Sequence, residues 1–176
     1  IELLAANNVH VAHCPESNMK LASGFCEVDK LRKKGINVAI GTDSAASNNN
    51  LDMLEETRSA TLLSKVLAND ATSINAHEAL SMATINGARL LGLDQKIGSL
   101  EKGKLADIIA VDFSAINFQP MHNPVSQLIY TATGHQVSHT WINGKLLYND
   151  GEFTRLDVTR LRANVRQWQD KIGTIT

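Results

Sequence analysis

Residues 36–41 (INVAIG) form a nearly continuous apolar run that ends directly in Thr-Asp-Ser. Such a run is typical of a parallel strand, because helices cover both faces of a parallel sheet. A second strand-like segment, residues 9–14, ends at Pro15, which cannot donate to a sheet ladder. Between them, residues 26–35 have helical spacing, with Val28 and Leu31 on one face and a glycine as the stop. Strand, helix and strand in this order predict an α/β fold with a parallel sheet.

Two further helices are expected after this unit. Residues 51–67 carry leucines and a valine near helical spacing, and acidic residues in the first turns suit the helix dipole. Asn75 and Glu78 have the spacing of a capping box, which predicts a helix that runs on to a stop at Gly92.

After residue 93 the pattern changes to strands. Residues 102–112 and 137–150 are strand-like, and Asn143-Gly144 within the second segment predicts a hairpin turn. Residues 155–172 have a helical period, and we expect this helix to pack on the outside. The change in pattern predicts two domains, residues 1–95 and residues 96–176.

Charge and cysteine content exclude several classes of partner. The formal net charge is −1, so no electrostatic footprint for nucleic acid or an acidic membrane is present. No apolar run approaches the roughly 20 residues that span a bilayer. Two cysteines cannot form a secreted-type disulfide framework, so we expect a cytoplasmic location.

Polar side chains follow each of the two predicted parallel strands. The first strand is followed by HCPESN (residues 13–18) and the second by GTDSAASNN (residues 41–49). Because ligands collect at the carboxyl ends of parallel strands, both stretches are candidate site segments. Asp43 is consistent with a metal ligand, a general base or a helix cap. Capping of the following helix is the competing interpretation for Ser44, Asn48 and Asn49.

His13 is the second candidate. His10 and His13 are three positions apart, so on a strand they point to opposite faces and are a poor chelating pair. The alternative role for His13 is a structural histidine bonded to a backbone carbonyl. Cys14 next to it is not a nucleophile paired with His13, because adjacent strand residues face opposite sides.

Three stretches of the sequence resemble the amidohydrolase superfamily. They are VAHCPESNMKLASG (residues 11–24), GTDSAASNNNLDMLEETR (41–58) and ATINGARLLGLDQKIGSLEKGKLADIIAVD (83–112), in the order found in that superfamily. They are most similar to the branch of s-triazine chlorohydrolases and 5-methylthioadenosine/S-adenosylhomocysteine deaminases. The resemblance implies an α/β protein made of the last βα units of a metal-dependent (β/α)8 barrel and the C-terminal part of a small β-sandwich domain.

The resemblance also implies roles for individual residues. Asp43 matches the family's metal-associated aspartate at the end of strand eight, as both metal ligand and catalytic base. His13 matches the histidine of the strand-seven motif, which faces the active site and contacts substrate or nucleophile. Ser17, Asn18 and Ser44 lie where they would line the substrate pocket. Ser44 stands where most deaminases of this kind have a glycine after this aspartate.

The implied cofactor is one divalent metal, Zn or Fe, and the implied reaction is deamination of a purine nucleoside by metal-activated water. Dechlorination by a chlorohydrolase is the alternative, since water activation suits both reactions. The family's other metal ligands come from an HxH pair and from histidines after strands five and six, and none of these motifs occurs in the 176 residues.

A complete barrel takes about 250 residues. We therefore expect a chain that begins after strand six, is inactive alone and holds an incomplete metal site. The small-molecule substrate belongs to the longer parent. A third possibility is a non-catalytic segment whose open edge strand pairs with another copy, forming a homo-oligomer.

Overall fold

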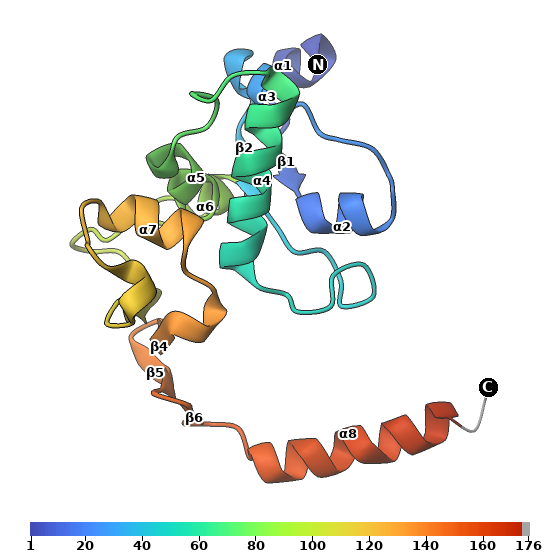
Figure 1. The fold of residues 1–176 in the computed structure, drawn as a ribbon, viewed down its shortest axis with the longest axis vertical. Coiled ribbons are helices and arrows are strands. Elements are labelled where there is room, and N and C mark those ends of the chain that lie inside the picture. The colour runs from blue at the N-terminus through green and yellow to red at the C-terminus, as the bar shows by residue number, and fades with distance from the viewer. Residues whose placement is uncertain (174–176) are drawn as a thin grey trace.

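The computed structural model describes residues 1–173 as a mixed α/β arrangement (Figure 1). The first part of the chain contains a parallel strand pair and the helices that connect it. Its elements are α1 (Glu2–Ala6), β1 (Val11–His13), α2 (Pro15–Lys20), α3 (Val28–Lys33), β2 (Val38–Ile40), α4 (Met53–Ala68), α5 (Ala76–Met82) and α6 (Ile85–Leu90).

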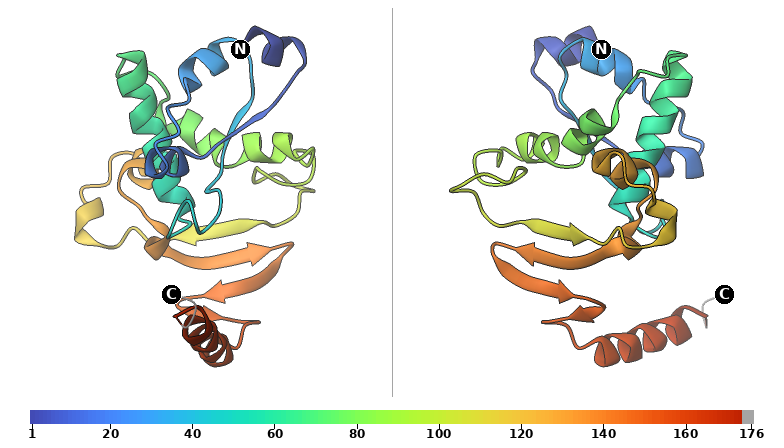
Figure 2. Two further views of the ribbon diagram at one scale, coloured as in Figure 1. Left: turned by 90° about the vertical axis from the view of Figure 1, so that its right-hand side faces the viewer. Right: turned by 60° about the vertical axis from the view of Figure 1, so that its left-hand side comes forward.

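The second part contains an antiparallel sheet in the order β3-β4-β5-β6, with a long terminal helix beyond it (Figure 2). Its elements are β3 (Ile108–Val111), the 3-10 turn η1 (Ile116–Phe118), α7 (Pro124–Tyr130), the 3-10 turn η2 (Gly134–Gln136), β4 (Val137–Ile142), β5 (Lys145–Asn149), β6 (Glu152–Phe153) and α8 (Val158–Gly173).

The predicted βαβ unit is confirmed. β1 and β2 pair in parallel, with Val11 opposite Val38 and His13 opposite Ile40. Both strands are shorter than predicted. β1 ends at His13 because Pro15 opens α2 at its first helical position, where no backbone N–H is required.

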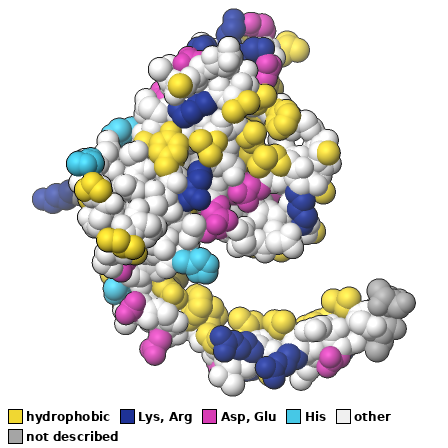
Figure 3. Space-filling view, viewed as in Figure 1, with side chains coloured by type: hydrophobic (Ala, Val, Ile, Leu, Met, Phe, Trp, Pro, Cys, Tyr) yellow, Lys and Arg dark blue, Asp and Glu magenta, His cyan; other side chains and the backbone are white. Residues whose placement is uncertain are grey.

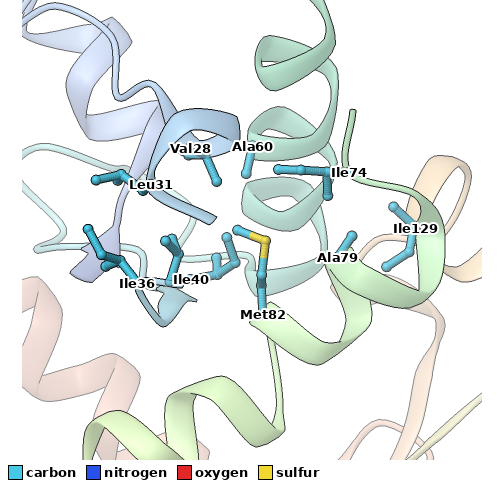
Figure 4. Close-up of a cluster of buried hydrophobic side chains, with 10 residues drawn as sticks. Val28, Leu31, Ile36, Ile40, Ala60, Ile74, Ala79, Met82 and Ile129 are labelled. Atoms are coloured by element: carbon cyan, nitrogen blue, oxygen red, sulfur yellow. The ribbon is translucent and has the colours of Figure 1, made fainter. Parts of the chain in front are cut away.

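One hydrophobic core holds the helices against this strand pair (Figure 4). Val28 and Leu31 of α3 are buried in it, as their spacing predicts, together with the side chains of β2. Each large apolar side chain buried in this way stabilises the fold by about 1.5–3 kcal/mol. The core is completed by Ile36, Val38, Ile40, Ala60, Ile74, Ala79, Met82 and Ile129.

Helix α4 begins at Met53, and its cap is Asp52. The Asp52 carboxylate accepts hydrogen bonds from the N–H groups of Leu54 (2.9 Å) and Glu55 (3.3 Å). The expectation that Ser44, Asn48 or Asn49 caps this helix is therefore wrong, because all three lie at least three residues before the cap.

The buried face of α4 also differs from the prediction. Leu62, Val66 and Leu67 are exposed on the described structure, whereas smaller side chains and one carboxylate face the core. The buried residues of α4 are Glu56, Thr57, Ala60, Thr61 and Ser64.

The capping box of Asn75 and Glu78 is confirmed, but the helix it starts ends at Met82. Thr84 has non-helical dihedral angles (φ −132°, ψ −95°), and the chain turns there into α6. α6 then packs beside β2, where the Asn86 side chain donates to the carbonyl of Val38 at 3.0 Å. The predicted single helix to Gly92 is thus two helices, because the second one leaves the first to reach the strand.

The hairpin at Asn143-Gly144 is confirmed. Both residues have positive φ angles (50° and 70°), as a two-residue turn of this type requires, and β4 pairs with β5 across them. Among the elements that the sequence did not predict are the two-residue strand β6 and helix α7. Asn123 caps α7, and Ile129 inserts into the core between the helices of the first part.

Helix α8 extends away from the rest of the molecule (Figure 1). None of its described side chains is buried, so the expected packing against the outside of the fold is not observed. Leu161, Val165 and Trp168 form part of an exposed apolar row along one side of the helix (Figure 3). Within residues 1–173, no helix has both the length and the apolar character needed to cross a membrane.

Candidate active site

The carboxyl ends of β1 and β2 bring two serines to one carboxylate oxygen. The hydroxyl of Ser17, in α2, donates to Oδ2 of Asp43 at 2.8 Å. The hydroxyl of Ser47, in the loop that follows β2, donates to the same oxygen at 2.5 Å. Ser47 was missed in the sequence analysis, although it lies four residues after Asp43 in the same polar stretch.

These contacts keep Asp43 ionised. Its side chain is exposed, and the hydroxyls of Ser47 and then Ser17 hold the pKa of its carboxyl below the usual range. Asp43 also has a left-handed backbone (φ 60°), which aspartate tolerates better than most residues. The result is a charged carboxylate oxygen presented to solvent at the end of a parallel strand.

Ser44 lies beside this carboxylate and organises the turn after it. Its backbone N–H hydrogen-bonds to Asp43, and its carbonyl accepts from the N–H groups of Ser47 (3.1 Å) and Asn48 (2.8 Å). The Ser44 side chain is exposed, on the same loop as Asp43.

Ser17 and Asn18 belong to helix α2, which the sequence did not predict. Cys14 directly precedes the helix, and Pro15 occupies its first position. The pattern of residues 13–18 alone did not indicate that a helix begins there. The structure brings Ser17 to Asp43. Asn18 lies instead beside His13 and Cys26, in a crevice against α4.

His13 lies on the face of β1 that the helices cover. Val11 and His13 share one face by strand alternation, and Val11 packs on the core, whereas Ala12 is exposed on the other face. His13 is 4% exposed and lies against Leu63 of α4. The expectation that His13 faces the active site therefore differs from the structure, because the parity of the strand turns this side chain toward the helix layer.

Burial also sets the charge of His13. Desolvation lowers the pKa of its imidazole to about 4, so the ring is neutral at physiological pH. A buried neutral histidine on the core face fits the structural role better than the catalytic one.

Glu56 is a buried glutamate that contacts the two segments of the candidate site. Glu56 of α4 is 0% exposed and accepts hydrogen bonds from the side-chain amide of Asn48 (2.5 Å) and the backbone N–H of Glu16 (3.2 Å). Burial raises the pKa of Glu56. From the sequence, the acidic residues in the first turns of α4 were predicted only to interact favourably with the helix dipole. Glu56 is four positions before Ala60 and shares its buried face, but the sequence pattern predicted burial of other residues of this helix.

In the range 1–173, no group of three or more His, Cys, Asp or Glu side chains is placed to hold a metal ion. The role of Asp43 as a metal ligand therefore stays a prediction.

Comparison with known proteins places the chain in a family. The model of the amidohydrolase family matches residues 1–147. A 5-methylthioadenosine/S-adenosylhomocysteine deaminase of Teredinibacter turnerae is 52% identical over 173 residues, which cover 98% of this chain and 39% of that protein. A protein of the same name from Moorella thermoacetica is 50% identical, covering 97% of this chain and 40% of that protein.

Solved structures agree with these relatives. The crystal structure of an adenosine deaminase from Xanthomonas campestris with bound zinc matches 98% of this chain and 39% of its own, with 51% identity and a TM-score of 0.95. Atrazine chlorohydrolase from Arthrobacter aurescens, complexed with zinc, matches 93% of this chain and 36% of its own, with 29% identity and a TM-score of 0.82.

The chain thus spans about two fifths of the length of the curated relatives that it matches. The resemblance predicted from residues 11–24, 41–58 and 83–112 is confirmed, because the matched region includes all three stretches. The chain belongs to the amidohydrolase family.

Proposed function

We propose that this chain is part of a metal-dependent hydrolase that deaminates a purine nucleoside such as 5-methylthioadenosine or S-adenosylhomocysteine. The observation that carries the proposal is the Asp43 carboxylate, held by Ser17 and Ser47 at the carboxyl end of a parallel strand pair. The names of the relatives at 52% and 50% identity support this substrate class.

The proposed architecture follows from the family. β1 and β2 would be the last two strands of a (β/α)8 barrel, within a domain of residues 1–95. The antiparallel sheet β3–β6 would form the C-terminal part of a small β-sandwich within residues 96–176. A cytoplasmic location, a lack of nucleic-acid partners and homo-oligomers formed through edge strands stay predictions.

Zinc fits the chemistry of Asp43, and iron is the alternative metal. An ionised carboxylate oxygen is a normal zinc ligand, and hydroxyl donors that orient such a ligand are typical of metal sites. When bound, the metal would lower the pKa of a water toward ~7. The remaining ligands would come from outside the described residues, so Asp43 would be one ligand of the metal among several.

Asp43 would act as the proton carrier of the reaction. Its carboxylate would take a proton from the water that adds to the amino-bearing ring carbon, and later deliver a proton to the leaving amine. The carbon–nitrogen bond then breaks, and the products are ammonia and the keto base. Ser17 and Ser47 would hold the carboxylate, and Ser44 would face substrate. His13 and Asn18 would support β1 and α2 from the helix side.

Dechlorination of an s-triazine is the second candidate, favoured by the structural match to atrazine chlorohydrolase. Atrazine chlorohydrolase is 29% identical to this chain, whereas the zinc-bound adenosine deaminase is 51% identical. Deamination is therefore the preferred reaction.

The test uses the full-length protein that carries this segment, loaded with zinc. Release of ammonia would be measured with 5-methylthioadenosine, S-adenosylhomocysteine and adenosine, and release of chloride with atrazine. We expect ammonia from at least one nucleoside. Turnover of atrazine alone would overturn the deaminase proposal in favour of the chlorohydrolase.

A further inference from the structure

Glu56 contacts both chain segments that hold Asp43. Its Oε2 accepts a hydrogen bond from the backbone N–H of Glu16, and its Oε1 accepts one from the side-chain amide of Asn48. Glu16 immediately precedes Ser17, and Asn48 immediately follows Ser47. Each serine that donates to Asp43 is therefore the chain neighbour of a residue that donates to Glu56.

Further hydrogen bonds restrict the conformations of Asn48 and Glu16, the two residues that donate to Glu56. Asn48 is 3% exposed, and its Oδ1 accepts from the backbone N–H of Leu51 at 3.1 Å, which fixes the orientation of the amide. On the other side, the Glu16 carboxylate accepts from the hydroxyl of Ser59 at 2.8 Å, so α2 and α4 are joined twice.

We propose that Glu56 is a positioning residue for Asp43, a buried carboxylate that joins α2 to the loop after β2 so that the two serine hydroxyls converge on one oxygen. The inference rests on the proposed role of Asp43 and adds a residue that touches neither metal nor substrate. Burying a carboxylate opposes folding unless both oxygens are satisfied, and here two segments of the site supply the donors.

A donor–acceptor swap tests this arrangement. Glu56→Gln leaves one acceptor for two donors, and because Asn48 is fixed by Leu51, one of the two hydrogen bonds is lost in either orientation. Asn48→Asp places a second carboxylate against Glu56. The double variant restores all three hydrogen bonds, since the new amide at position 56 donates to the new carboxylate at position 48, and it keeps the net charge.

The variants would be made in the full-length protein that carries this segment, and three quantities would be measured. These are zinc affinity, deuterium exchange of the backbone amides of Glu16 and Leu51, and kcat and KM for 5-methylthioadenosine. We expect Glu56→Gln to weaken zinc binding by about tenfold and to lower kcat by about tenfold, with KM little changed. Deuterium exchange at the backbone amide of Glu16 should become faster. The double variant should recover to within about threefold of wild type.

Glu55→Gln is the matched control, because Glu55 is the neighbouring acid and its side chain bonds only to Asn50 among the described hydrogen bonds. A purely structural role for Glu56 would lower the thermal midpoint while leaving zinc affinity and kcat of the folded protein unchanged, and that result would overturn the proposal. A double variant that is as defective as Glu56→Gln, or that does not fold, would also overturn it.

The readouts separate this inference from the proposed function. Zinc affinity and amide exchange need no substrate, so they report on Glu56 even if the wild type deaminates no nucleoside. If both single variants fail to fold, the double variant decides, since its zinc affinity either matches wild type or does not.

Discussion

The Ser17 hydroxyl lies 2.8 Å from Oδ2 of Asp43, although 26 positions separate the two residues in the chain. The parallel pairing of β1 with β2 makes this contact possible, because it brings the ends of both strands to one edge. The conformation of Asp43 therefore depends on two segments, and changes in either segment should reach the carboxylate.

Removing the serine hydroxyls should weaken metal binding. We expect Ser17→Ala and Ser47→Ala each to lower the zinc affinity of the full-length protein by about tenfold, since partners that orient a ligand typically contribute 10–100-fold. Titration with a competing chelator measures this. Ser114→Ala is the control, because its hydroxyl bonds to the exposed Asp112 far along the chain. Equal affinities in all three variants would contradict the account.

Asp52 should contribute to stability in two separable ways. Its Oδ1 caps α4, and its Oδ2 accepts from the backbone N–H of Gly134 at 2.7 Å. Asp52→Ala removes both contacts and should cost about 1–2 kcal/mol in the free energy of unfolding. Asp52→Asn keeps the cap and loses the bond to Gly134, so urea unfolding should place it between wild type and Asp52→Ala. An Asn variant no more stable than the Ala variant would show that the cap contributes nothing.

Gly98 should not tolerate a side chain. A Cβ there would lie 2.7 Å from Cβ of Ala88 and 2.9 Å from Cα of Ile85, in addition to the strain of φ +89°. Gly103 has a similar φ of +99° but nothing within 4 Å. Gly98→Ala should therefore be less stable than Gly103→Ala by about 1–3 kcal/mol, measured by thermal or urea unfolding. Equal losses would mean that α6 moves aside without cost.

His13 should make stability depend on pH below neutrality. Its pKa is about 4 in the folded protein against an ordinary value of 6.5, so between these values the unfolded chain binds more protons. Stability should therefore fall as pH drops from 6.5 toward 4, by at most about 3 kcal/mol from this group. Below pH 4 the folded protein also takes up the proton, and the loss stops growing.

The matched variant for this prediction is His13→Gln, which keeps a polar side chain without a charge change in this range. The difference in unfolding free energy between wild type and His13→Gln should rise with pH between about 4 and 6.5 and be flat above. Parallel pH profiles would mean that His13 is solvated in the native state.

Local signals in the sequence predicted the elements whose partners are close in the chain. The capping box joins Asn75 to Glu78, three residues away, and the hairpin depends on the dihedral angles of Asn143 and Gly144 alone. The strand pair was also predictable, because a continuous apolar run such as residues 36–41 has few alternatives.

The features that were missed depend on distant packing. Helix α7 is stabilised where Ile129 enters a core built from residues far earlier in the chain. Strand parity predicted opposite faces for His10 and His13, but only the position of the helix layer decides which face of β1 meets the core. Glu56 was overlooked for the same reason, since a first-turn acid becomes part of a site only when Asn48 and Glu16 are brought to it.

The most direct test of the central claim is the turnover of 5-methylthioadenosine by the zinc-loaded full-length protein carrying Asp43→Asn. The amide keeps the size of the side chain but cannot take the proton, so kcat should fall by about 100-fold or more. Asp150→Asn, at an exposed hairpin position, is the control and should match wild type. An Asp43→Asn variant that retains kcat within about threefold of the control would contradict the account.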